Sequence, residues 1–217
     1  MRLQARRLHS VYQSLFERYG PQAWWPGDSS FEIMVGAVLT QNTAWINVER
    51  AIANLINAQA LDAARILDVE ETQLAEWLRP SGYFNIKAKR LRNFCRWYVD
   101  AGAYQQLSAI ETDALRRALL AVNGIGPETA DDILLYAFNR PVFVIDAYTR
   151  RLFARLGLIE GDEGYETLRQ GFEAALGQDE LLFNEYHALI VTHVKDVCRA
   201  RPRCAECVLR KQCPSAI

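Results

Sequence analysis

The sequence lacks the features that would assign it to a membrane or a strongly basic class of protein. No apolar run reaches the roughly 20 residues of a membrane-spanning helix, and the N-terminus has no hydrophobic signal region. Basic residues do not exceed acidic ones, with 25 against 26 and a formal net charge of −1. We therefore expect a cytoplasmic protein with no membrane partner, in which only a local basic patch could bind DNA.

Strand-like segments and internal repeats are equally scarce, and helical periodicity dominates. Apolar residues recur at three and four from Leu8 to Tyr19, where Gly20-Pro21 ends the pattern. Ser29 and Glu32 have the spacing of a helix capping box. The only strand-like run, Pro141–Ile145, is too short and isolated to start a sheet, so the predicted fold is all-α. Further helices are expected at about 112–121, 127–138, 147–156, 165–176 and 180–197.

Cysteine is rare except at the C-terminus. Cys95 stands alone and is expected to be a core residue. The other four follow the pattern Cys198-x5-Cys204-x2-Cys207-x5-Cys213. In a cytosolic chain such clustering is typical of metal ligands rather than disulfides. Spacing alone favours a tetrahedral zinc ion over the alternative, a four-thiolate [4Fe–4S] cluster.

A glycine-rich turn, Val122–Pro127, separates two predicted helices. Gly124 and Gly126 can adopt positive φ at little cost, and Pro127 suits the first position of a helix. Exposed amides beside a helix N-terminus form a site for a phosphate oxygen. A simple helix connection that needs glycine for its geometry explains the same pattern equally well.

Asp146 follows the apolar run and precedes an arginine-rich helix. An aspartate in this position is a common N-cap. The helix N-terminus also favours the ionised carboxylate, and an ionised carboxylate stabilises a cationic sugar in a transition state. One side chain could therefore serve as both the cap and the catalyst.

Together these residues resemble a known family. The segment Asn123–Ala130, followed by Val144-Ile145-Asp146, looks like the helix-hairpin-helix and catalytic aspartate of the endonuclease III superfamily of DNA glycosylases. Ala37–Thr43 and Ser81–Ala88 are similar to two segments that wedge into DNA at a flipped-out base in that family. The resemblance implies that Asp146 is catalytic and that the cysteines hold a [4Fe–4S] cluster, although the first cysteine gap is usually six residues there. It also implies DNA contacts by Gln41, Tyr83, Lys87, Asn123, Gly124, Ile125, Gly126 and Thr129.

One departure from the family pattern bears on mechanism. Bifunctional members carry a nucleophilic lysine two residues after the second hairpin glycine, and this chain has Glu128 there. A carboxylate cannot form a Schiff base with the sugar. We therefore expect a monofunctional enzyme without lysine-dependent strand cleavage.

A narrower resemblance concerns the base pocket. Ala23–Pro26 and Arg79–Gly82 are similar to the 3-methyladenine DNA glycosylase III subgroup, which lacks the cluster. This similarity implies a pocket formed by Trp24, Trp25, Trp45 and Lys195. Indole faces attract cations such as N-alkylated purines by about 0.5–2 kcal/mol. Core packing is the alternative role for any one tryptophan, but two adjacent ones on an irregular segment cannot both face one core.

The expected organisation is two helical lobes with an active-site cleft between them. Residues 29–140 would form a helical barrel that ends in the helix-hairpin-helix. Residues 1–28 and 141–217 would form the second lobe, which carries the iron–sulfur loop 198–213. The expected protein is a monomer that hydrolyses the N-glycosidic bond of a damaged base, an alkylated purine, in double-stranded DNA. Alternatives are an enzyme for oxidised pyrimidines or mismatched bases, a non-catalytic damage sensor, and a zinc-stabilised interaction module.

Overall fold

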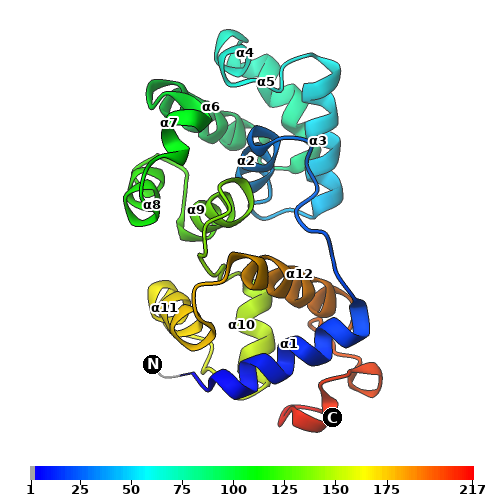
Figure 1. The fold of residues 1–217 in the computed structure, drawn as a ribbon. Helices are drawn as coiled ribbons and strands as arrows, with labels where there is room; N and C mark the ends of the chain where they lie inside the picture. Colours follow the sequence, from blue (N-terminus) through cyan, green and yellow to red (C-terminus); the bar gives the residue numbers. More distant parts are fainter. Residues whose placement is uncertain (1–2) are drawn as a thin grey trace. The chain divides into compact units, whose positions relative to one another are not determined.

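The computed structural model describes residues 3–217 and contains helices but no strand within that range (Figure 1). The chain forms two compact units. Unit 1 comprises Met1–Trp25 and Asn139–Ile217, and unit 2 comprises Pro26–Phe138. The boundaries expected from the sequence were 28/29 and 140/141. In the part of the chain that the structure describes, no helix is both long and apolar enough to span a bilayer.

Unit 1 is built from helices contributed by both ends of the chain. Helix α12 packs against both α10 and α1, and α1 also packs against α11 (Figure 1). Its core is aromatic: the rings of Phe143 and Phe172 stack at 4.6 Å between centroids, and Phe153 meets Phe172 edge-on at 4.8 Å. The helical elements are α1 (Ala5–Tyr19), α10 (Ala147–Arg155), α11 (Tyr165–Leu176), α12 (Glu180–Asp196), η3 (Cys204–Glu206) and η4 (Arg210–Gln212).

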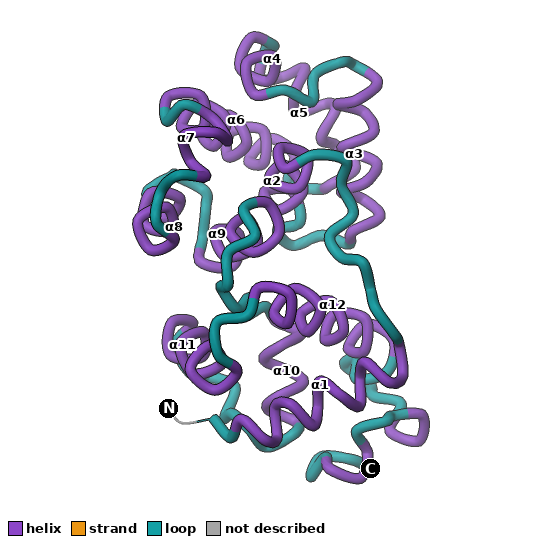
Figure 2. Tube along the Cα trace, viewed as in Figure 1, coloured by secondary structure: helices purple, strands orange, loops and turns teal. Residues whose placement is uncertain are grey.

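Unit 2 is built around helix α2, whose residues from Met34 to Leu39 are all buried. Helices α3, α6 and α9 pack against α2 (Figure 2). The isolated Cys95 is fully buried in this unit, and burial raises the pKa of its thiol to about 12, which keeps it unreactive. The elements are α2 (Ser30–Leu39), α3 (Trp45–Asn57), α4 (Ala63–Asp68), α5 (Glu71–Leu78), η1 (Arg79–Ser81), α6 (Phe84–Asp100), α7 (Ala103–Ser108), α8 (Thr112–Leu120), α9 (Pro127–Asp132) and η2 (Ile133–Ala137).

Helix boundaries follow the local chemistry of the sequence. The Ser29 hydroxyl accepts a hydrogen bond from the Glu32 N–H at 3.1 Å, so the predicted cap is present. The Glu32 carboxylate accepts from the N–H of Asp28 at 3.2 Å, one residue earlier than a capping box requires. The helix expected at 127–138 is α9 followed by the π-helical η2. The run 141–145 is extended and pairs with no strand in the described range, as expected.

Candidate nucleic-acid interface and active site

The turn Val122–Pro127, called the hairpin from here on, uses its two glycines differently. Gly124 has φ +99°, a left-handed conformation that favours glycine, and a Cβ there would also collide with the side chain of Arg90. Gly126 has φ −93° and open space around it, so the expectation of positive φ at this position is wrong. Pro127 is the first residue of α9, as predicted.

A buried ion pair joins the two helices that flank the hairpin. Arg116 on α8 donates from Nε to Asp131 Oδ1 at 2.6 Å and from Nη2 to Oδ2 at 3.1 Å. Asp131, on α9, is fully buried. This two-pronged geometry fixes the angle and register of the helices as well as neutralising the charges. Sequence reasoning missed the pair, because nothing in the sequence matches two charges 15 positions apart.

The loop after α2 is hydrogen-bonded to the hairpin. Gln41 Nε2 donates to the Gly124 carbonyl at 3.1 Å and to the Thr129 hydroxyl at 3.0 Å. Arg90 donates in turn to Gln41 Oε1. Thr129 is 5% exposed. Its hydroxyl faces Gln41 inside the unit.

At the tip of the hairpin, Asn123 is exposed and Ile125 is buried. Asn93 on α6 donates to the Asn123 carbonyl at 3.2 Å. Of the residues expected to contact DNA here, the structure therefore leaves the Asn123 side chain and the backbone of the two glycines accessible.

Tyr83 has the position of a wedge. Its side chain is 68% exposed, and it precedes α6 in the left-handed conformation with φ +47°. A bulky residue in that conformation costs on the order of 1–3 kcal/mol, and such strain gathers at functional sites.

Lys87 is not available to DNA, which corrects the sequence-based expectation. Its side chain is 1% exposed, and its ammonium donates to the carbonyls of Leu39 at 2.8 Å and Ser81 at 2.6 Å. Burial, together with the nearby charge of Arg90, lowers the pKa of Lys87 to about 8. The lysine thus ties the end of α2 to the turn before α6.

Asp146 caps helix α10 and is nearly buried, at 9% exposure. Its Oδ1 accepts from the Thr149 N–H at 2.6 Å, and its Oδ2 lies 3.6 Å from His187 Nε2. Burial by itself raises the pKa of Asp146, but the hydrogen bonding and charge of His187, together with the bonds from Thr149, outweigh it and leave the pKa below the ordinary aspartate value. The carboxylate is therefore ionised at neutral pH.

Part of the predicted base pocket lies within unit 1. The rings of Trp24 and Trp25 meet edge-on with centroids 5.9 Å apart. The ammonium of Lys195 lies 5.8 Å from the Trp24 ring centroid and 6.0 Å from that of Tyr148. Trp45 belongs to unit 2, where its indole N–H donates to Glu49 at 2.8 Å.

Sequence reasoning overlooked two residues of this region, Tyr148 and His187. Tyr148 follows Asp146 by two positions, and its ring contacts the same ammonium as Trp24 does. His187 precedes Lys195 on α12 by eight residues, and residues eight apart share a helix face. That spacing could have identified His187 as a neighbour of the site.

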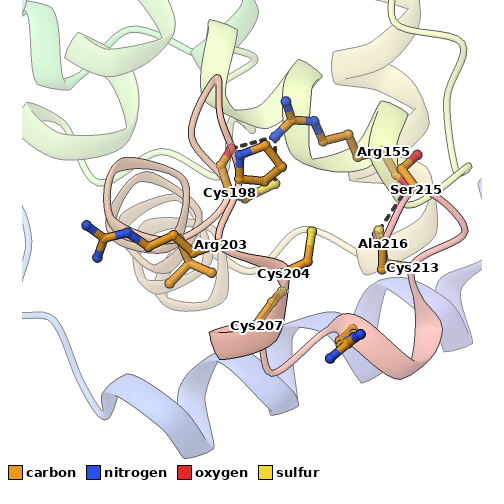
Figure 3. A pocket seen from close by; sticks show the side chains of 11 residues that line it. Arg155, Cys198, Arg203, Cys204, Cys207, Cys213, Ser215 and Ala216 are labelled. Atoms are coloured by element: carbon orange, nitrogen blue, oxygen red, sulfur yellow. Dashed lines mark hydrogen bonds between the residues drawn. The ribbon is translucent and has the colours of Figure 1, made fainter.

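The four C-terminal cysteines line one pocket, together with apolar groups such as Val197, Pro202 and Ala216 (Figure 3). The segment Cys198–Cys213, called the cysteine loop from here on, follows α12. Cys198 is buried and the other three are half-buried. Burial raises the pKa of the Cys207 thiol, and negative charge on the other three cysteines raises it further. The donor set, four cysteine side chains that line one pocket, has the chemistry that a zinc ion or an iron–sulfur cluster requires. Among residues 3–217, no group of three or more His, Cys, Asp or Glu side chains has an arrangement that could hold a metal ion.

Arg155 anchors the cysteine loop to α10 (Figure 3). Its guanidinium donates to the carbonyls of Cys198 at 3.0 Å, Arg199 at 2.7 Å and Ala200 at 3.1 Å, and to the Cys198 sulfur at 3.4 Å. The Cys213 thiol donates to the carbonyl of Arg155 at 3.3 Å. One residue thus holds the loop near both of its ends.

His193 contacts the loop from α12 and is fully buried, as expected of a hydrogen-bonded core residue. Its Nδ1 lies 2.9 Å from the Tyr19 hydroxyl, and its Nε2 lies 3.5 Å from the Cys207 sulfur. Burial lowers the pKa of His193 to about 4, so the ring is neutral at physiological pH.

Comparison with known proteins identifies the family. Residues 35–178, which include the hairpin and Asp146, match the HhH-GPD superfamily base excision DNA repair protein model. The chain therefore belongs to the HhH-GPD superfamily of base excision DNA repair proteins. This membership confirms the resemblance to helix-hairpin-helix DNA glycosylases and the all-α fold.

Individual relatives span nearly the whole chain. A Methanocaldococcus jannaschii protein named as a DNA repair glycosylase is 45% identical over 211 residues, which are 96% of each chain. Endonuclease III of Sulfolobus acidocaldarius is 28% identical over 185 residues, 84% of this chain and 81% of that one. Among solved structures, the 3-methyladenine DNA glycosylase MagIII of H. pylori, bound to 1,N6-ethenoadenine, has a TM-score of 0.76 at 31% identity and covers 89% of this chain and 98% of its own. An endonuclease III–DNA complex has a TM-score of 0.84 at 18% identity, covering 99% and 97%, and supports the fold.

Proposed function

We propose that this protein is a monofunctional DNA glycosylase that removes N-alkylated purines from double-stranded DNA and leaves an abasic site. We further propose that it acts as a monomer in the cytoplasm. The observation that carries the proposal is the Asp146 carboxylate, which is held ionised at the start of α10, two residues from a tyrosine that shares a cation contact with Trp24.

The reaction follows from these groups. As the bond between sugar and base breaks, positive charge develops on the sugar, and the ionised carboxylate of Asp146 stabilises it. A water molecule then adds to the sugar carbon and transfers a proton to the Asp146 carboxylate. An alkylated purine is already cationic, so it leaves without being protonated by the enzyme. Selection and extrusion of the base then become the main tasks of the protein.

The aromatic rings near Asp146 support the choice of substrate. Trp24 and Tyr148 both lie within cation–π distance of the Lys195 ammonium, and aromatic rings of this kind also attract an N-alkylated purine. Within unit 1 the pocket would comprise Trp24, Trp25 and Lys195, to which Tyr148 is added here. The 31% identity to MagIII, whose structure holds an adenine derivative, points to the same class of base.

The absence of lysine at position 128 supports the monofunctional assignment. Glu128 follows the second hairpin glycine by two residues and offers no amine for a Schiff base. Lys195 supplies an amine within the proposed pocket. Borohydride trapping of enzyme and damaged DNA should give no covalent complex, and a complex lost in Lys195→Met would show lyase activity from that residue.

DNA binding is assigned to the hairpin and to Tyr83. The hairpin backbone would bind a phosphate oxygen through its amides, with Asn123 and Gly126 accessible. Tyr83 would separate neighbouring base pairs, because its ring is exposed and carried by a strained backbone.

We also propose that Cys198, Cys204, Cys207 and Cys213 hold a [4Fe–4S] cluster. When bound, it would supply a rigid covalent centre for a loop that carries Arg199, Arg201, Arg203, Arg210 and Lys211. Zinc is the alternative. Purified protein should absorb at about 400 nm and contain iron, whereas colourless protein with one zinc ion per chain would contradict the cluster.

The test of the activity is base release from DNA. Duplexes treated with a methylating agent are incubated with the pure protein, and the released bases are identified. Asp146→Asn should abolish release while retaining DNA binding, a loss of about 10²–10³-fold or more. Asp179→Asn is the matched control, because it removes a cap carboxylate from another helix of unit 1. Equal release by the wild type and Asp146→Asn would overturn the catalytic assignment.

A second candidate substrate class is oxidised pyrimidines or mismatched bases. The 28% identity to an endonuclease III favours it. Excision of such bases with none of alkylated purines would overturn our substrate assignment but keep the glycosylase. Wild-type protein that binds damaged duplex and releases no base from a full panel would instead be a damage sensor.

A further inference from the structure

Gln41 has a structural role in this protein that differs from the one implied by the family resemblance. The resemblance implies that the loop after α2 inserts into DNA, where Gln41 would fill the gap left by the flipped-out base. In the structure its side chain faces the hairpin instead. We infer that Gln41 and Arg90 form a brace that holds the hairpin in its phosphate-binding conformation. This inference rests on the proposed DNA-binding function of the hairpin.

Both the nitrogen and the oxygen of the Gln41 amide have partners within unit 2. A primary amide has two N–H donors and one carbonyl oxygen. Nε2 donates to the Gly124 carbonyl and to the Thr129 hydroxyl, and Oε1 accepts from the Arg90 guanidinium. The opposite orientation of the amide would place its oxygen against the Gly124 carbonyl and its NH₂ against the guanidinium. The surroundings therefore fix which way the amide points.

Arg90 contacts the hairpin a second time through its aliphatic stem. A Cβ placed on Gly124 would overlap the Cβ, Cγ and Cδ of Arg90. The stem thus packs against the glycine backbone, while the guanidinium holds Gln41. Arg90 is carried by α6, whose next turn supplies Asn93 to the Asn123 carbonyl. The hairpin is therefore supported from one side by α6 and by the loop after α2.

Insertion of Gln41 into DNA would undo this arrangement. The Gly124 carbonyl, the Thr129 hydroxyl and the Arg90 guanidinium would all lose the amide at the moment when the hairpin must grip a phosphate. Insertion of Tyr83 would not disrupt a comparable set of contacts, since this residue is 68% exposed. The geometry assigns Gln41 to positioning and leaves insertion to Tyr83.

The test separates a brace from a gap filler by comparing two DNA ligands. Dissociation constants of Gln41→Leu, Arg90→Met and the double variant are measured for an undamaged duplex and for the same duplex with one tetrahydrofuran abasic analogue. A brace predicts that both single variants weaken both duplexes by a similar factor, about tenfold for one or two lost hydrogen bonds to a charged or carbonyl group. It also predicts that the double variant is no weaker than the worse single variant.

Two controls account for general effects. Arg65→Met removes one positive charge from an exposed position of unit 2, and Gln73→Leu removes an exposed amide from the same unit. Both should bind like the wild type. A loss confined to Gln41→Leu and to the abasic duplex, with Arg90→Met unchanged, would identify Gln41 as a gap filler and overturn the brace.

Hydrogen exchange tests the brace without DNA. Backbone amides of residues 124–129 should exchange faster in Arg90→Met and Gln41→Leu than in the wild type, while those of α3 stay unchanged. Unchanged exchange at 124–129 in both variants would overturn the brace. If the wild type binds neither duplex, the proposed function fails, and the exchange result still decides the brace. Should Gln41→Leu fail to fold, Gln41→Glu serves instead, because it keeps the volume and replaces the donor with a second acceptor.

Discussion

The two units hold their functional loops by different means. In unit 2 the hairpin rests on a fully buried carboxylate paired with Arg116 and on the buried side chain of Ile125. In unit 1 the short helices η3 and η4 of the cysteine loop contain no buried residue, and the loop is held by Arg155, by its own cysteines and by one fully buried apolar side chain, Leu209. A buried ion pair therefore fixes the hairpin in the free protein, whereas the cysteine loop depends on Leu209, on polar contacts and on the group that its thiolates would bind.

The largest effect is expected at the buried ion pair of unit 2. Arg116→Met leaves the Asp131 carboxylate buried without its guanidinium, which costs on the order of 3–5 kcal/mol of unfolding free energy. Urea denaturation should show this loss, and binding of undamaged duplex should weaken with it, while any absorbance from the cysteine loop is retained. Arg117→Met, on the exposed neighbouring position, is the control. If the two variants were equally stable, the ion pair would not be what fixes the hairpin.

The matching change in unit 1 is expected to be smaller. Arg155→Met removes a guanidinium that donates to three carbonyls, but two of these hydrogen bonds are exposed, and water can replace them in the variant. The loss should therefore stay below that of Arg116→Met, which leaves a fully buried carboxylate without its partner. The cysteine loop should become sensitive to protease and lose any bound metal faster to a chelator, with binding of undamaged duplex unchanged. Arg203→Met, from an exposed pair, should do neither. If Arg155→Met also weakened binding of undamaged duplex, the two loops would not be independent.

The sequence predicts the local features of both units and misses the long-range ones. Helix starts at Ser29 and Asp146 follow from cap chemistry, and Gly124 and Pro127 follow from backbone geometry, because each involves only neighbouring residues. The burial of Lys87 could not be predicted, since its carbonyl partner on Leu39 lies 48 positions away. Lys87 belongs to a basic run, 87–96, and such a run is typical of an exposed helix face. Only the tertiary structure shows that Lys87 is buried.

Lys87 gives a pH test of charge burial in unit 2. Its pKa is lowered to about 8 in the folded protein from 10.5, so between these values the unfolded chain binds more protons. The stability contribution of Lys87 should therefore rise as the pH rises from about 8 towards 10.5. Urea unfolding at several pH values measures it, as the difference between wild type and Lys87→Met. Lys89→Met, on an exposed position, should show no such slope. A difference that stays constant with pH would show that the ammonium is not desolvated.

The smallest effect is expected from a change at His187, whose ring lies beside the Asp146 carboxylate in unit 1. The balance between burial and local interactions there is the opposite of that at Lys87. Desolvation governs Lys87, whereas the interactions of Asp146 with His187 and Thr149 outweigh burial and keep the pKa of the carboxyl low. An Asp with a lowered pKa keeps its charge until the pH falls through that pKa, so excision should persist into the acid range. His187→Gln removes the largest lowering influence and leaves the burial, so the acid limb of kcat/KM should move to higher pH with little change at neutral pH. His9→Gln, an exposed control, should leave the profile in place. An acid limb that does not move in His187→Gln would mean that Thr149 and the start of α10 keep the carboxylate charged without the histidine.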